Sequence, residues 1–134
     1  MTCRRRGDPI PRIGSHPRKI GRVRLVLAAL FLIGNAWAAS DAEKIRYLIS
    51  SVEHMPKARF IRNGKAYDAK AAADHLREKK RNAKGHCDTA EDFIKLCGAK
   101  SSQSGKPYQI RFADGRVITS EQFLRQKLKE LDKR

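Results

Sequence analysis

Hydrophobic positions recur with two different periods over the last two thirds of the chain, and the changes of period predict its elements. Apolar residues at three- and four-residue spacing, typical of one helix face, occupy about 41–53, 69–82, 89–98 and the stretch after 120. Short runs typical of strands occupy 59–62, 65–67, 108–112 and 116–119, in pairs joined by Asn63-Gly64 and Asp114-Gly115. The predicted order is helix, hairpin, helix, and then the same again.

Polar residues mark the start of each predicted helix. Ser40-Asp41-Ala42-Glu43 has the pattern of a capping box, with a hydroxyl at the cap and a carboxylate three residues later. Asp68, Thr89 and Ser120 precede the other three helices and are expected to cap them.

The two halves of this pattern are similar to one another. A shift of 51 residues aligns three pairs of segments, Ile61 with Phe112, Asn63-Gly64 with Asp114-Gly115, and Ala72-Ala73 with Phe123-Leu124. The first and third helices align at a shift nearer 49. The similarity reflects either an old duplication or two like solutions to one patterning problem. Either origin predicts an α+β fold with four helices on one face of a four-stranded antiparallel sheet. Two separate hairpins are the alternative.

The region before residue 39 has the pattern of a secretory signal. Residues 1–24 hold eight basic residues and one acidic residue, the apolar run Leu25–Ile33 follows, and Ala36-Trp37-Ala38 ends the segment. The run falls short of the roughly 20 apolar residues of a spanning helix. We therefore expect 1–38 to be a Sec-type signal peptide, 39–134 to be one small mature domain, and the address to be periplasmic.

Three alternatives to this interpretation remain. The segment could stay uncleaved as a membrane anchor, whereas a cleaved signal meets the membrane only transiently. Arg4-Arg5-Arg6 suggests a twin-arginine signal, but about 18 residues separate it from the apolar run. Translation could also begin nearer Val23, because the basic leader is long and contains three prolines.

Removing the leader lowers the net charge from +16 to +9, since residues 39–134 hold 22 basic and 13 acidic residues. A charge of +9 still suits anionic partners such as phospholipid head groups, lipopolysaccharide or acidic glycans. Lysine-rich helix faces that keep a small protein soluble are the simpler explanation. An exported address disfavours nucleic acid as the partner.

Cys87 and Cys97 are the two cysteines of the predicted mature domain. An oxidising compartment favours a disulfide between them. However, a regular helix from Thr89 carries Cys97 about 12 Å along its axis, farther than the roughly 7 Å that a disulfide allows between Cα atoms. Unless the helix starts late, we expect the two sulfur atoms to lie too far apart for a disulfide. Cys97 is then a small core residue, and Cys87 is a free thiol in a loop.

The loop at 100–108 is the first candidate site because hydroxyls and cations gather there. Its candidate anion-binding residues are Lys100, Ser101, Ser102, Ser104, Lys106 and Tyr108. The loop is no P-loop, since Pro107 follows Gly105-Lys106 where Ser or Thr is required. Ordinary loop composition would also account for these residues.

The turn of the first hairpin is the second candidate, through Arg59, Arg62 and Asn63. Catalytic and metal-binding patterns are absent from the sequence. His54, His75 and His86 stand at no strong metal-ligand spacing, and the loop serines lack the S-x-x-K spacing of a serine–lysine nucleophile. The sequence thus predicts no metal, no cofactor and no enzyme activity.

Two stretches resemble the signatures of a known family. The first runs from Arg59-Phe60-Ile61-Arg62-Asn63-Gly64 into Ala72–Lys79, and the second from Thr89–Ile94 into Lys100–Tyr108. Together they resemble the YfeK-like family of small exported proteobacterial proteins, a domain of unknown function. The resemblance covers nearly all of 39–134 and implies a periplasmic address and a single small domain. It implies no activity, cofactor or catalytic residue, and neither cysteine belongs to its pattern.

These observations lead to one interpretation and two competitors. The leading interpretation is a non-enzymatic periplasmic protein that binds an anionic envelope component or another periplasmic protein through the 100–108 loop. The competitors are a structural interaction module of the cell envelope and a hydrolase that uses a serine of the loop.

Overall fold

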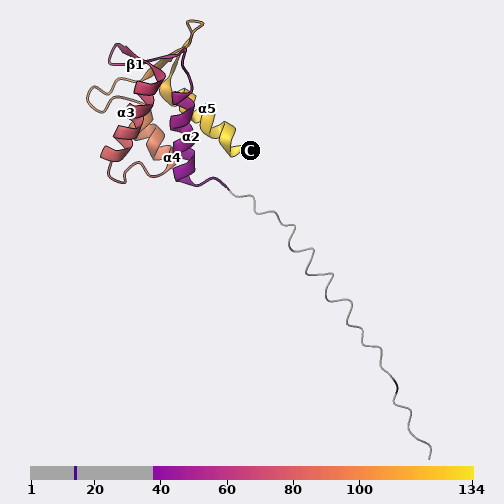
Figure 1. The fold of residues 1–134 in the computed structure, drawn as a ribbon. Coiled ribbons are helices and arrows are strands. Elements are labelled where there is room, and N and C mark those ends of the chain that lie inside the picture. The colour runs from indigo at the N-terminus through magenta and orange to yellow at the C-terminus, as the bar shows by residue number, and fades with distance from the viewer. Residues whose placement is uncertain (1–13, 15–37) are drawn as a thin grey trace, which may run out of the picture. The chain divides into compact units, whose positions relative to one another are not determined.

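The structure is a computed structural model that describes residue 14 and residues 38–134 (Figure 1). The signal peptide predicted over 1–38 and the alternatives to it fall almost wholly outside the described residues, so they stay predictions. No helix in the described part of the chain combines the length and apolar character needed to cross a bilayer.

Within residues 38–134, nine elements follow one another in the order that the sequence predicts. They are α2 (Asp41–Glu53), β1 (Arg59–Arg62), β2 (Lys65–Tyr67), α3 (Ala69–Asn82), α4 (Ala90–Asp92), η2 (Phe93–Gly98), β3 (Gln109–Arg111), β4 (Val117–Thr119) and α5 (Ser120–Asp132). α4 continues directly into η2, a π-helix, and the two together form the predicted third helix. The four helical segments and both hairpins are therefore confirmed.

The predicted caps are confirmed at three helices and wrong at the fourth. Ser40 forms a capping box with Glu43, while Asp68 and Thr89 accept hydrogen bonds from the first turns of α3 and α4. α5 is capped by Thr119 instead of Ser120. The reason is that Gln122, three residues after Thr119, completes a second capping box, so Ser120 becomes the first helical residue.

The strands form a single antiparallel sheet in the order β2-β1-β3-β4, which confirms the predicted α+β fold. Asn63 and Gly64 adopt positive φ angles of 49° and 79°, as a two-residue hairpin turn requires. Phe60 and Ile110 pair at the centre of the sheet and are buried. Their strand neighbours point to the opposite face, where Arg59, Gln109 and Arg111 are exposed and Ile61 is half-buried, so the helices cover one face only.

The internal similarity is visible in this sheet, because Phe60 and Ile110 are equivalent residues that pair with each other. The two halves are thus related by an approximate two-fold axis between β1 and β3. The offset between equivalent residues grows along the chain, from 49 at the caps Ser40 and Thr89 to 51 at the caps Asp68 and Thr119. The shift of 51 that aligns Ile61 with Phe112 is therefore one residue too long, since the offset between β1 and β3 is 50.

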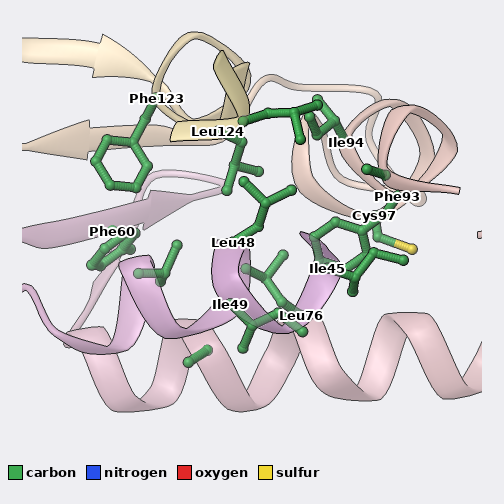
Figure 2. Close-up of a cluster of buried hydrophobic side chains, with 14 of the residues drawn as sticks. Ile45, Leu48, Ile49, Phe60, Leu76, Phe93, Ile94, Cys97, Phe123 and Leu124 are labelled. Atoms are coloured by element: carbon green, nitrogen blue, oxygen red, sulfur yellow. The ribbon is translucent and has the colours of Figure 1, made fainter. Parts of the chain in front are cut away.

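The hydrophobic core lies between the sheet and the helices, and every helical segment contributes to it (Figure 2). Leu48 of α2, Phe93 and Ile94 of η2, and Leu124 of α5 are completely buried. α3 contributes Leu76 together with small residues, so this helix fills less volume than the others.

Cys87 and Cys97 meet within this core, contrary to the sequence-based expectation. Their Sγ atoms lie 2.7 Å apart and both residues are 1% exposed. The expectation was wrong because it assumed a regular α-helix from Thr89. Instead, a turn with positive φ at Lys84 and Gly85 precedes Cys87, and the helix widens into η2 before Cys97.

Candidate functional site

Side chains from three separate segments meet beside the buried face of the sheet. Arg62 at the end of β1 lies with its Nη1 3.1 Å from Nδ1 of His75, which projects from α3. Nε2 of His75 lies 3.2 Å from the hydroxyl of Tyr108, the residue before β3. Lys79, one helical turn after His75, places its Nζ 3.4 Å from the same hydroxyl and 2.8 Å from the carbonyl oxygen of Lys100. We call Arg62, His75, Lys79 and Tyr108 the cationic cluster.

The direction of the hydrogen bonds in the cationic cluster follows from what each group can do. A guanidinium only donates, so Nδ1 of His75 must accept from Arg62, and Nε2 must carry the proton of the neutral ring. Nε2 then donates to the oxygen of Tyr108, which also accepts from Lys79. The hydroxyl proton of Tyr108 is left without an acceptor within residues 38–134. The last group in this series of hydrogen bonds, the hydroxyl of Tyr108, can therefore still donate one.

Burial shapes the electrostatics of the cluster. The pKa of His75 is lowered, first by burial and then by the charges of Arg62 and Lys79, which keeps the ring neutral near pH 7. Burial also lowers the pKa of Lys79 and raises the pKa of Tyr108. In the described part of the chain, Arg62 forms no ion pair with a carboxylate, so none of these residues neutralises its charge directly.

A cavity of about 150 Å³ opens beside the cluster, between α3 and the helix-facing side of the sheet. Its walls are mostly apolar and include Val52, Phe60, Tyr67, Ala72 and Leu76. Arg62, His75 and Tyr108 also line it. The cavity therefore combines an apolar interior with hydrogen-bonding side chains of the cationic cluster.

Asn63 holds the 100–108 loop against the first hairpin. Its Nδ2 donates to Oγ of Ser101 at 3.4 Å, and its Oδ1 accepts from Oγ of Ser104. Ser101 is only 3% exposed, and its backbone also bonds to Gly105 and Lys106 across the loop. Ser101, Ser104 and Asn63 therefore close the loop onto the hairpin.

The structure brings together only some of the residues predicted as a site. Arg62, Asn63, Ser101, Ser104 and Tyr108 converge, although they come from two segments almost forty residues apart. The remaining predicted residues lie elsewhere. Arg59 points to the solvent-facing side of the sheet, since it alternates with Phe60 and pairs with Arg111. Lys100, Ser102 and Lys106 are exposed, and their side chains form no hydrogen bond within residues 38–134.

Sequence reasoning missed His75 and Lys79 as members of the site. In the sequence, His75 is a histidine without strong metal-ligand spacing, and both His75 and Lys79 belong to the first stretch that resembles the family. Their spacing of four residues puts both on one face of α3, which is a signal that the sequence does contain. The same spacing gives no hint that Tyr108 would face them.

Comparison with known proteins places the chain in a family. The model of DUF5329, a family of unknown function, matches residues 39–132. The chain belongs to this family. It is also 34% identical over 90 residues to the uncharacterized protein YfeK of Salmonella typhimurium. The aligned region covers 65% of this chain and 75% of that protein. The resemblance to the YfeK-like family is thereby confirmed. No solved structure matches the chain.

The matched residues contain the whole cationic cluster and the cavity, so the site lies within the part that defines the family. Chemically, the arrangement can bind a hydrogen-bond acceptor that carries negative charge. Neither Lys100 nor Lys106 bonds to a serine through its side chain in residues 38–134, and Ser101 accepts from Asn63 and from the backbone of Ser104. The geometry thus offers anion binding more directly than serine chemistry.

Proposed function

We infer that this member of DUF5329 is an exported, non-enzymatic binding protein that holds a small anion at the cationic cluster. The observation that carries the inference is that the hydroxyl of Tyr108 has no hydrogen-bond acceptor within residues 38–134. Arg62 donates to His75, His75 and Lys79 donate to Tyr108, and the hydroxyl proton has no acceptor within residues 38–134. A carboxylate or phosphate oxygen would accept this proton and offset the charge of Arg62.

Desolvation supports a role in binding. Tyr108 is buried and Arg62 and His75 are half-buried at the cavity, where an ionic hydrogen bond is stronger than at an open surface. The exposed side chains of Lys100 and Lys106 add positive charge to the loop, which favours the approach of an anion but does not select one. We therefore assign specificity to the cationic cluster and long-range attraction to the loop.

A nuclear magnetic resonance titration of the purified protein with acetate and with inorganic phosphate tests anion binding. We expect shifts of the His75 ring nitrogens and of the amides around Tyr108. Arg62→Gln should abolish these shifts. Arg59→Gln is the matched control, because it removes the same charge from the same strand on the opposite face. Equal loss of binding in both variants, or no shift with either anion, would contradict the proposal.

Export and the absence of enzyme activity need separate tests. Cell fractionation followed by N-terminal sequencing should find the protein in the periplasm with Ala39 as its first residue. A fluorophosphonate probe should leave the folded protein unlabelled. Retention in the cytoplasm would contradict the proposed periplasmic localisation. Labelling of a loop serine by the probe would support the hydrolase alternative instead.

A further inference from the structure

The approximate two-fold axis provides an internal comparison for the cavity. Asp68 and Thr119 cap α3 and α5 at equivalent positions, 51 residues apart. The same offset makes Ala72 of α3 equivalent to Phe123 of α5. Phe123 is 5% exposed and packs its ring into the core (Figure 2). Ala72 has no side chain beyond Cβ, and it lines the cavity.

The cavity therefore lies where the other half of the molecule holds a phenylalanine ring. Its volume of about 150 Å³ agrees with this comparison. An apolar cavity of about that size is known to accept benzene. The space beside α3 is thus large enough for one six-membered ring and too small for a long acyl chain.

The polar groups at the cavity also differ from their equivalents in the other half. Tyr108 is equivalent to Ala58 at the strand offset of 50, and His75 is equivalent to Gln126 at the helix offset of 51. The hydroxyl of Tyr108, from the second half, and the imidazole of His75, from the first, thus lie at the cavity beside Ala72, whereas their equivalents Ala58 and Gln126 carry neither group. The smaller side chain at Ala72 and the additional hydrogen-bonding groups of His75 and Tyr108 occur at the same cavity. A simple packing defect does not explain this coincidence.

We propose that the cavity binds a small organic anion in which a single carboxylate or phosphate group is attached to a ring-sized apolar group. The ring occupies the space beside Ala72, and the anionic oxygens accept hydrogen bonds from Tyr108 and Arg62. This inference rests on the proposed function and adds the class of ligand to it. The charge complementarity between Arg62 and the anion sets the orientation, with the ring inside and the anionic group at the cluster.

Benzoate, acetate and benzyl alcohol are suitable probes, since they separate the ring from the charge. For the purified protein we expect the Kd for benzoate to be at least about tenfold below the Kd for acetate, because burial of the ring adds hydrophobic free energy. Benzyl alcohol, which keeps the ring and lacks the charge, should bind more weakly than benzoate.

Ala72→Phe is the decisive variant, because its ring would occupy the space as Phe123 does in the other half. It should reduce benzoate affinity to that of acetate while leaving acetate binding unchanged. Ala66→Phe, on an exposed position of β2, is the matched control for adding a ring. Ala72→Leu serves as a smaller second variant, and amide spectra establish that each variant is folded.

The outcomes separate the ligand class from the underlying function. Equal Kd values for benzoate and acetate, or unchanged benzoate binding in folded Ala72→Phe and Ala72→Leu, would overturn the ring-sized ligand and leave anion binding standing. Failure of both acetate and benzoate to bind would overturn the proposed function as well. Benzyl alcohol binding more tightly than benzoate would show a cavity that excludes charge and would overturn both.

Discussion

Arg59 and Arg111 lie directly opposite each other on the two central strands of the sheet, on the face that the helices leave open. Within residues 38–134, neither guanidinium forms an ion pair with a carboxylate. Like charges at directly opposed positions of an antiparallel pair are destabilising. The two halves of the molecule therefore meet along a strand pair that carries a repulsive contact on its exposed face.

Arg111→Glu should increase the free energy of unfolding by about 0.2–1 kcal/mol, because it replaces this repulsion with an opposite-charge pair. Urea denaturation at low and high salt measures the change, which salt should reduce. Arg111→Gln separates relief of repulsion from the gain of an ion pair and should fall between the two. A destabilised Arg111→Glu variant would mean that the two guanidiniums do not repel each other in solution.

Gly98→Ala should destabilise the protein by about 1–3 kcal/mol, although alanine is usually favoured over glycine in a helix. A Cβ at position 98 would collide with Cδ1 of Leu124, which is completely buried. Thermal or urea unfolding measures the cost. Leu124→Val shortens the opposing side chain, so the double variant should lose less stability than the sum of the single variants. Strict additivity would contradict direct contact between the two positions.

His75→Gln should make the stability of the protein less dependent on pH between about 5 and 7. The folded state lowers the pKa of His75 below its ordinary value near 6.5 through burial and through Arg62 and Lys79, which the nearby Glu78 only partly offsets. As the pH falls through 6.5 the unfolded state binds the proton first, so the wild-type protein loses stability until the pH passes the folded pKa.

Urea midpoints across this pH range provide the measurement, since Tyr108 does not titrate there. Nitrogen spectra of the His75 ring offer an independent check, because the hydrogen-bond pattern requires the proton on Nε2 at pH 7. A wild-type midpoint that stays constant from pH 7 to 5, or a ring protonated on Nδ1, would disagree with the structure.

Refolding in a glutathione redox buffer should join Cys87 and Cys97 in a disulfide. Their sulfurs are in contact inside the core, and burial together with the neighbouring Cys87 raises the pKa of the Cys97 thiol to about 12. The Cys97 thiol of the native protein is thus protonated and unreactive at neutral pH, and both cysteines are buried, so oxidation must occur before the core closes. Oxidised glutathione accepts the two electrons and leaves as two reduced glutathione molecules.

Intact mass should show the loss of two hydrogens, and the crosslinked form should be more stable than the reduced form by about 2–4 kcal/mol. The Cys87→Ser variant, treated in the same way, controls for mixed disulfides with glutathione. Recovery of a fully reduced native protein from the oxidising buffer would contradict this expectation.

Much of the fold could be predicted from local signals. The capping residue Ser40 and the turn residues Asn63-Gly64 depend on interactions within a few positions, and both predictions are confirmed. The contact between Cys87 and Cys97 could not be predicted, because it depends on a π-helix for which the sequence carries no simple pattern.

The candidate site was predicted only in part, for a related physical reason. Arg62 and Tyr108 were both chosen for their chemistry, but nothing local indicates that they share a cavity. Their proximity depends on the pairing of β1 with β3, which joins residues about fifty positions apart. The cavity itself depends on a side chain that is absent at Ala72, and patterns of hydrophobic residues do not report missing volume.

The pairing of β1 with β3 also has a consequence for the rate of folding. Each hairpin closes over a short turn, and α2 and α3 can meet within the first half of the chain, so each half is rich in local contacts. The strand pair at the centre, in contrast, requires two preformed halves to find each other across a long loop. Association of the two halves should therefore limit the folding rate, much as association limits the folding of a dimer.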